Sequence, residues 1–194
     1  ILDFDAAIKH NKYNEKYYNT RGMLYFRLQD GYMAVADFTQ AIKEKFNYAM
    51  PYFNRAMSYK KFPYSVSTDS NVDAIDKIRL QRQKMLEDLS SAIRYKPNFD
   101  AAYVERGLIN STDMRNKSTP DAETINRLNL ALADFEKAIK YNPKNAEAYC
   151  FVQTTSPAVG AKRSSISIHF EPNFRCARLG TFLTKTPAET IASS

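Results

Sequence analysis

The residues best suited to catalysis are few and far apart in this chain. It has two histidines, His10 and His169, and two cysteines, Cys150 and Cys176. Histidine can activate a cysteine nucleophile, yet the pattern around Cys150 favours a position on a helix face over a Cys150–His169 pair. No paired nucleophile pattern, glycine-rich phosphate loop or metal-ligand spacing occurs in the sequence. We therefore expect no enzyme, no metal site and no other cofactor.

The two cysteines also indicate the cellular compartment of the protein. They have no motif spacing, and disulfide-stabilised scaffolds are much richer in cysteine, so we expect a reduced, cytoplasmic protein. A ciliary, cytoskeletal or organellar assembly is an alternative. No apolar run approaches the roughly 18 residues of a membrane helix, so no membrane span is expected. The chain opens at Ile1 inside a helical phrase, which is typical of a piece of a longer protein, so the absence of a targeting segment means little.

Basic residues could bind nucleic acid, and the formal net charge is +7. Residues 60–84 hold six basic and three acidic side chains, and residues 151–194 hold five basic and two acidic ones. These two stretches supply +6 of the +7, which leaves the rest of the chain near neutral. Solvated insertions explain this pattern more simply than a phosphate-binding track. RNA binding through the basic insertion and tail remains the alternative function, and we regard nucleic acid as disfavoured.

Aspartates recur at equivalent places, and their spacing shows how the chain is built. Asp3, Asp37, Asp88 and Asp134 each stand just before an aromatic residue or leucine. They recur because a whole phrase does: residues 34–42 read AVADFTQAI and residues 131–139 read ALADFEKAI, with weaker copies at 1–8 and 85–93. We expect these carboxylates to face solvent. A repeated helical phrase indicates units that stack on their neighbours, with function in the surface of the stack.

The period of the phrase is that of a helix–turn–helix unit. Phe4 and Phe38 are 34 residues apart, whereas the next two intervals, to Leu89 and then to Phe135, exceed 34 by 17 and 12 residues. After two of the copies, Pro97 and Pro143 predict the end of one helix before the next begins.

A second phrase follows each turn and predicts the first helix of the next unit. It places a tyrosine three residues before an arginine, which precedes a glycine or alanine. The three copies are Tyr18, Arg21, Gly22 and Tyr25; Tyr52, Arg55, Ala56 and Tyr59; and Tyr103, Arg106, Gly107 and Asn110. These spacings put the residues on one helical face, where a small residue lets a second helix approach closely.

This combination resembles the tetratricopeptide repeat family. The family phrase has an aromatic residue, a Leu-Gly pair and a tyrosine on the first helix, then an alanine, an aromatic residue and a proline on the second. The first unit matches it with Tyr18, Gly22, Tyr25, Ala34 and Phe38; the second with Tyr52, Ala56, Tyr59, Leu89 and Pro97; the third with Tyr103, Gly107, Ala131, Phe135 and Pro143. The departures are Arg21, Arg55 and Arg106 for leucine, Asn110 for tyrosine, Met85 for alanine and Phe46 for proline.

The resemblance implies an all-α, right-handed α-solenoid. We expect residues 1–150 to form the repeat array: a half repeat, three repeats with insertions near 60–84 and 111–122, and the start of another. Both insertions should lengthen second helices. Ser118, Thr119 and Pro120 predict a helix start, and Ile75, Ile78 and Met85 belong to a stripe in helical register. The overlong helices would project from one rim, either as tolerated loop growth or as a ledge for a partner.

The family binds peptides or helices on the concave surface formed by first helices. The resemblance therefore implies a non-catalytic scaffold or adaptor, expected within a larger multi-protein assembly. Helical spacing predicts this partner-binding groove from Asn19, Met23, Phe26, Arg27, Met50, Phe53, Asn54, Met57, Lys60, Lys61, Val104 and Leu108. Its apolar middle and basic edge suit an apolar peptide or helix with acidic residues. The chain's own tail or a neighbouring helix is an equally open alternative occupant.

Chaperone-binding members of the family grip a terminal carboxylate with lysine, arginine and asparagine side chains. Asn54 matches the middle asparagine of that set. The other places hold Asn19, Met23, Ala101 and Glu105, and a glutamate would repel a carboxylate. We therefore disfavour a chaperone carboxylate clamp.

Residues 151–194 read as a non-repeat, loop-rich tail. Residues 153–167 are rich in serine, threonine and small residues, and residues 165–170 alternate like a short strand. The composition does not show whether this segment docks on the array.

Overall fold

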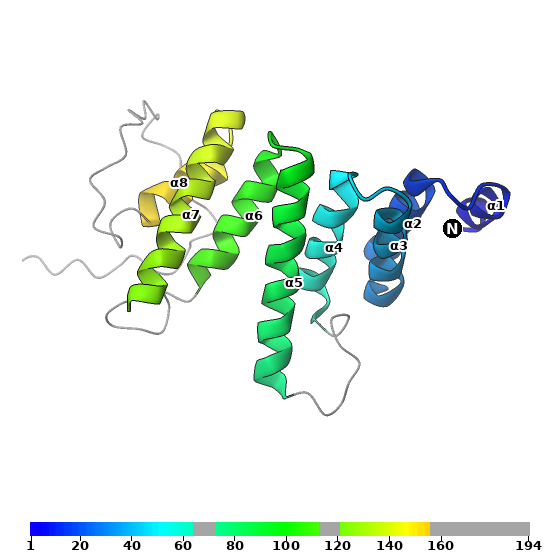
Figure 1. Ribbon diagram of the computed structural model, residues 1–194, viewed down its shortest axis with the longest axis horizontal. Coiled ribbons are helices and arrows are strands. Elements are labelled where there is room, and N and C mark those ends of the chain that lie inside the picture. Colours follow the sequence, from blue (N-terminus) through cyan, green and yellow to red (C-terminus); the bar gives the residue numbers. More distant parts are fainter. Residues whose placement is uncertain (64–72, 113–120, 156–194) are drawn as a thin grey trace, which may run out of the picture.

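The computed structural model describes residues 1–63, 73–112 and 121–155 (Figure 1). Within these ranges the chain is all helical, without a strand. The helices are α1 (Leu2–His10), α2 (Glu15–Arg27), α3 (Gly31–Glu44), α4 (Ala49–Lys61), α5 (Ala74–Tyr95), α6 (Asp100–Ser111), α7 (Ala122–Tyr141) and α8 (Ala146–Thr155). The all-α fold expected from the sequence is therefore confirmed.

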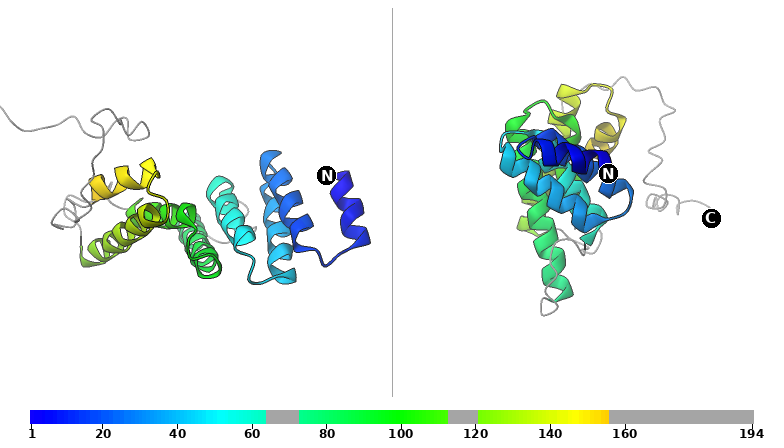
Figure 2. Two further views of the ribbon diagram at one scale, coloured as in Figure 1. Left: turned by 90° about the horizontal axis from the view of Figure 1, so that it is seen from above. Right: turned by 90° about the vertical axis from the view of Figure 1, so that its right-hand side faces the viewer.

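The helices follow one another along the long axis of the molecule, from α1 at one end to α8 at the other (Figure 2). The most extensive contacts join α2 to α3, α4 to α5, and α6 to α7, so these pairs are the three whole repeats. Smaller contacts join α3 to α4, α5 to α6, and α7 to α8. Each repeat thus packs on its sequence neighbours, as expected for a solenoid. Its right-handed sense stays a prediction.

The second helices end in the same way in every repeat. The backbone amides of the C-cap residues Lys45, Lys96 and Asn142 donate to the carbonyls of Ala41, Ala92 and Ala138. A basic residue also lies in the last turn of each of these helices, where it complements the helix dipole. The repeated sequence therefore produces a repeated helix end.

The core consists of small and large residues that fit together within each repeat. Phe38, Leu89 and Phe135 are fully buried. A Cβ added to Gly22 would lie 2.8 Å from Phe38 Cε1, and one added to Gly107 would lie 2.7 Å from Phe135 Cε1. In the second repeat, Ala56 and Leu89 belong to one buried cluster. A large phenylalanine therefore faces glycine, whereas the smaller leucine accompanies alanine.

The second helices of the two repeats with insertions are long, as predicted. α5 has 22 residues and α7 has 20, compared with 14 in α3. The prediction that a hydroxyl group caps α7 is wrong. The N-cap is Asp121, whose side chain accepts a hydrogen bond from the Thr124 amide at 2.9 Å. Ser118, Thr119 and Pro120 lie outside the described residues.

The predicted apolar stripe along α5 is buried over only part of its length. Met85 and Leu89 are buried, whereas Ile75 and Ile78 are 70% and 65% exposed. Figure 1 shows this end of α5 projecting beyond the neighbouring helices. Whether the projection is a partner ledge or simple loop growth stays open.

α8 continues past the expected end of the array, to Thr155. The strand predicted at 165–170 and the rest of the tail lie outside the described residues. The division of the chain at residue 150 therefore stays a prediction.

Candidate partner-binding face

The three arginines that depart from the family phrase hold the repeats together. Each donates two hydrogen bonds to an aspartate on the second helix of its own repeat. The pairs are Arg21–Asp37 at 2.8 and 2.6 Å, Arg55–Asp88 at 2.9 and 2.7 Å, and Arg106–Asp134 at 2.8 and 2.7 Å. Two parallel bonds between guanidinium and carboxylate fix the relative orientation of both helices.

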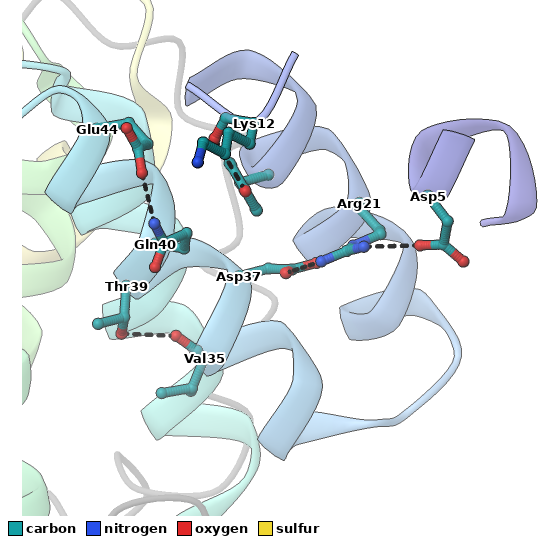
Figure 3. Close-up of polar contacts among 9 residues, drawn as sticks. Asp5, Lys12, Arg21, Val35, Asp37, Thr39, Gln40 and Glu44 are labelled. Atoms are coloured by element: carbon teal, nitrogen blue, oxygen red, sulfur yellow. Dashed lines mark hydrogen bonds and ion pairs between the residues drawn. The ribbon is translucent and has the colours of Figure 1, made fainter. Parts of the chain in front are cut away.

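The remaining nitrogen of each guanidinium, Nη1, reaches back to the preceding repeat. Arg21 donates to Asp5 at 2.6 Å, Arg55 to Thr39 at 3.0 Å, and Arg106 to Ser90 at 3.1 Å. The acceptors occupy equivalent places, each two residues after the aspartate position. Figure 3 shows Arg21 between Asp37 on α3 and Asp5 on α1. We call these three arginines, with their partners, the arginine ladder.

The arginine ladder corrects one prediction. Asp37, Asp88 and Asp134 were expected to face solvent, but they are only 4%, 5% and 4% exposed. The first-helix arginine makes this burial possible, because an isolated buried carboxylate would cost several kcal/mol. A signal was present: an arginine and an aspartate recur at fixed places in all three units. Asp3 is exposed, as expected.

Burial and pairing also affect the protonation of these groups. The hydrogen bonds to Asp37 raise the pKa of Arg21, and those to Asp134 raise the pKa of Arg106. For Arg55, burial lowers the pKa, but the bonds to Asp88 outweigh it and the net shift is upward. Burial raises the pKa of Asp88 more than Arg55 lowers it. In the second repeat, desolvation and pairing therefore oppose each other.

The first helices held by this ladder present the predicted groove residues, and polar contacts link them across repeats. The Asn54 amide donates to Asn19 Oδ1 at 3.0 Å, which joins α4 to α2. Lys60 and Glu105 form an ion pair at 2.6 Å between α4 and α6. Asn54 is only 8% exposed. Three of the polar residues expected to meet a ligand, Asn19, Asn54 and Lys60, therefore already bind neighbours within the array.

Aromatic contacts fix other predicted residues. The rings of Phe26 and Phe62 meet edge to face at 5.6 Å between centroids, and Lys61 Nζ lies 4.6 Å from the Phe26 centroid. Phe53 packs against Phe99 at 4.8 Å. Phe62, the buried C-cap residue of α4, was not among the predicted residues. It stands directly after the helical phrase, where helical periodicity gave no reason to select it.

The remaining predicted residues differ in exposure. Val104 is 4% exposed and belongs to the core. Met23, Met50, Met57 and Leu108 are half-buried, and the last three pack against the core clusters. Arg27 is exposed at the end of α2. The half-buried methionines and phenylalanines of α2 and α4 therefore form an apolar strip with exposed basic residues near one end.

Side chains suited to binding a metal ion do not gather in the described part of the chain. Within residues 1–63, 73–112 and 121–155, no cluster of three histidine, cysteine, aspartate or glutamate side chains could hold a metal ion. His10 ends α1, and His169 lies outside these ranges. None of the described helices is both long and apolar enough to cross a membrane.

Cys150 lies on α8, as the sequence suggested. The chain's other cysteine, Cys176, lies outside the described residues.

Comparisons with known proteins give a repeat profile in two segments of the chain and a fold. The sequence profile of the tetratricopeptide repeat matches residues 15–48 and 122–145. The Arabidopsis OM64 TPR domain has a TM-score of 0.53 and 20% identity, over 74% of this chain and 94% of that one. MamA has a TM-score of 0.58 and 16% identity, over 81% and 75% of the two chains.

A third similar structure contains a ligand. The second TPR domain of human RPAP3, in complex with an HSP70 peptide, has a TM-score of 0.52 and 21% identity, over 74% of this chain and 92% of that one. No curated protein sequence matches this chain. The recurring helix pairs, the profile matched over these two segments and the similar structures together show that the chain has the fold of tetratricopeptide repeat proteins and resembles that family.

Proposed function

We propose that this chain is a non-catalytic interaction scaffold that binds a partner peptide or helix on its first-helix face. The observation that carries this proposal is the apolar strip of α2 and α4. Met23, Phe26, Met50, Phe53 and Met57 are only half-buried by the chain's own helices. Methionine side chains adapt to varied partners, and further burial of this strip would be favourable. The family is generally a non-catalytic scaffold, which supports the same conclusion.

The charges beside the strip favour a partner with acidic residues at one end of its apolar face. Arg27 and Lys61 are exposed there. Lys60 contributes less to a ligand, because Glu105 already pairs with it. The partner is therefore expected to place its acidic residues beside α2 and the end of α4, and its apolar residues over the methionines.

A terminal-carboxylate ligand of the kind held by chaperone-binding relatives is disfavoured. The human RPAP3 domain binds an HSP70 peptide. Here the middle asparagine, Asn54, is buried and donates to Asn19. Glu105 stands in a place that would face the carboxylate, and its own charge would repel that group. These contacts favour an internal peptide or helix over a free C-terminus.

The wider setting of the scaffold belongs to the same proposal. We place it in a multi-protein assembly in the cytoplasm, and ciliary, cytoskeletal or organellar assemblies are alternatives. RNA binding is less well supported. Residues 64–72 of the basic insertion and all of the tail beyond Thr155 lie outside the described residues, and the lysines at the end of α4 contact Glu105 and aromatic rings.

Peptide selection tests the proposal and does not require an identified partner. A displayed library of random 12-residue peptides is selected on the protein, and the strongest binder is measured by calorimetry. We expect Met23→Glu and Met57→Glu to weaken it at least about tenfold, because a charge would be buried against an apolar ligand. Ile78→Glu is the matched control, since Ile78 is an exposed apolar residue on α5.

Circular dichroism establishes that each variant keeps its helical content. Equal affinity for the wild type, Met23→Glu and Met57→Glu would reject the first-helix face as the binding site. A loss confined to Ile78→Glu would move the site to the projecting end of α5. In a parallel titration with single-stranded RNA, affinity that falls steeply with salt would favour the nucleic-acid alternative.

A further inference from the structure

Phe46 departs from the family phrase in a way that neither the arginine ladder nor the apolar strip explains. It follows the C-cap of α3, in the turn that leads into α4, and its side chain is 67% exposed. The equivalent places after the C-caps of α5 and α7 hold Pro97 and Pro143. An exposed phenylalanine therefore stands in one of three matching turns where the other two have proline.

The backbone follows the same path in all three turns. Lys45, the residue before Phe46, has φ −148° and ψ 92°. Lys96 and Asn142, which precede the two prolines, have φ −138° and −137° and ψ 84° and 88°. In each turn the C-cap carbonyl accepts from the amide three residues later, at 3.2, 3.1 and 3.0 Å. Proline therefore fits at position 46, and the turn itself does not require phenylalanine.

Phe46 belongs to an aromatic cluster with two tyrosines of the next repeat. Its ring meets Tyr95, at the end of α5, edge to face at 6.1 Å between centroids. Tyr95 also packs on Tyr52 of α4 at 5.6 Å, and the Tyr52 hydroxyl donates to the Phe46 carbonyl at 2.9 Å. Both tyrosines are half-buried. We call these three residues the Phe46 cluster. It supports the Phe46 ring from one side and leaves most of its surface to solvent.

The two helix ends that carry the Phe46 cluster are basic. They hold four basic residues and one acidic residue, namely Lys43, Glu44, Lys45, Arg94 and Lys96. Lys45 pairs with Glu15 at 3.3 Å, whereas Lys43 and Arg94 are exposed in the last turns of α3 and α5. A partner that covers Phe46 therefore gains from acidic residues beside its apolar contact.

The chain's own segments outside the described residues are poor occupants of this surface. α4 and α6 end, and α5 and α7 begin, at the edge opposite the Phe46 cluster (Figure 1), so residues 64–72 and 113–120 attach at that opposite edge. Residues 151–194 hold five basic and two acidic side chains, and like charges disfavour them beside Lys43 and Arg94. The charges therefore favour a separate, acidic partner.

We propose that the Phe46 cluster is a second docking site, which binds an acidic segment of a partner protein through an apolar anchor residue. The anchor covers the exposed face of Phe46 beside Tyr95, and the acidic residues that flank the anchor approach Lys43 and Arg94. A ring that its neighbours already support loses little side-chain freedom on binding, so its burial adds to affinity. None of these residues belongs to the apolar strip of α2 and α4, so the proposal stands independently of the peptide site there.

Depletion of a peptide library on a proline variant tests this site. A displayed library of random 12-residue peptides is first depleted on Phe46→Pro and then selected on the wild type, and the strongest binder is measured by calorimetry. We expect it to combine an aromatic or large aliphatic residue with aspartate or glutamate. Phe46→Pro should weaken its binding at least about tenfold. The double change Lys43→Gln with Arg94→Gln should weaken it about threefold, and less at high salt.

Matched variants separate this site from other surfaces and from a change in folding. Tyr13→Ser removes an aromatic side chain that is 68% exposed in the turn between α1 and α2, and it should leave the affinity unchanged. Met57→Glu, in the apolar strip, should also leave it unchanged. Phe46→Pro should shift the midpoint of thermal unfolding by less than about 4 °C. Phe46→Ser repeats the binding measurement without a proline and should weaken binding as much.

The proposal is overturned if no peptide survives the depletion, or if Phe46→Ser binds the selected peptide as tightly as the wild type. Affinity that ignores Lys43→Gln with Arg94→Gln would overturn the acidic partner. Weaker binding by Met57→Glu would assign the peptide to the apolar strip instead. Light scattering of the protein alone adds one more outcome. Self-association that Phe46→Pro abolishes would assign the Phe46 cluster to a second copy of the chain and overturn the partner segment.

Discussion

The second whole repeat solves the same packing problem as the first and third with different residues. In the first and third, glycine meets a phenylalanine ring, whereas the second has Ala56 and Leu89. The cap of the second helix differs as well. Asp30 and Asp121 cap α3 and α7 through their side chains, whereas Asp73 makes no side-chain cap bond to α5.

What stays constant across the three repeats is the arginine–aspartate pair. All three pairs have two short bonds, and all three aspartates are buried. The sizes of the small residue on the first helix and the large residue on the second helix change together between repeats. The N-cap of the second helix changes independently of them. This difference suggests that the ion pair determines how the two helices meet, while the apolar couple and the cap adjust to it.

The largest effect is expected from breaking an ion pair on one side. Asp134→Leu leaves Arg106 without its carboxylate in a mostly buried place, which should cost about 3–5 kcal/mol in the free energy of unfolding. Replacing both partners, as in Arg106→Met with Asp134→Leu, should cost far less because no charge is left unpaired. Urea unfolding followed by circular dichroism measures both variants.

The same change in the second repeat sharpens the comparison. Asp88→Leu should lower the free energy of unfolding by a similar amount if all three ion pairs contribute equally to stability. A cost well below that of Asp134→Leu would show that the second repeat differs in its ion pair too, and would contradict the constancy argued above.

A smaller effect is expected from exchanging the apolar couples. Gly22→Ala places a Cβ 2.8 Å from Phe38 Cε1, and this overpacking should cost about 1–3 kcal/mol, reduced by the better helix propensity of alanine. Adding Phe38→Leu gives the first repeat the alanine and leucine combination of the second repeat. The double variant should be more stable, by at least about 1 kcal/mol, than the sum of the two single effects on the free energy of unfolding would predict. Thermal and urea unfolding of the four proteins in this cycle provide the coupling energy.

Ala56→Gly with Leu89→Phe is the reciprocal exchange, and it should show coupling of the same sign. If the single changes simply add in both repeats, the small and large residues are independent, and the comparison between repeats loses its meaning.

The sequence was sufficient for the repeat, its register and the long second helices, because these follow from spacing alone. Phe38 and Phe135 occupy equivalent buried places, and the insertions lengthened α5 and α7 as expected. The groove was harder to predict. Helical spacing places Val104 and Asn54 on the first-helix face, but exposure depends on neighbouring helices, and both residues are buried.

The burial of Asp37 was missed for a physical reason. Asp37 lies three positions after Ala34 and four positions before Ala41, which is the spacing of the buried face. A carboxylate on that face is expected to reach solvent unless a partner compensates its charge. The partner, Arg21, lies on another helix, so the sequence of either helix alone does not reveal the pair.

Caps should give the next smaller effect, and they separate the second repeat from the other two. Asp121→Ala removes a side-chain bond to the Thr124 amide and should cost about 1 kcal/mol. Asp73→Ala removes no such bond and should cost only a few tenths of that. Hydrogen exchange in the first turns of α5 and α7 would report each change locally. Equal costs at both caps would remove this distinction.

The smallest effect concerns the turn that the insertions replace. The first repeat connects α2 to α3 through three residues, and Gln29 in that turn has a φ of 66°. A side chain with a Cβ is strained in this left-handed region, whereas glycine is not. The larger freedom of glycine in the unfolded chain offsets part of the gain. Gln29→Gly should therefore raise the free energy of unfolding by less than about 1 kcal/mol, which thermal unfolding can resolve.

The effect of Gln29→Gly shows what stabilises the short turn between α2 and α3 in this repeat, which has no insertion. A gain would mean that glutamine is kept at a cost in stability, for a contact that it makes. A loss would mean that this contact outweighs the backbone strain. Gln29→Asn discriminates between these outcomes, because asparagine tolerates the left-handed region better than glutamine but lacks its reach. Stability of Gln29→Asn below both glutamine and glycine would show that neither strain relief nor the contact alone determines the turn.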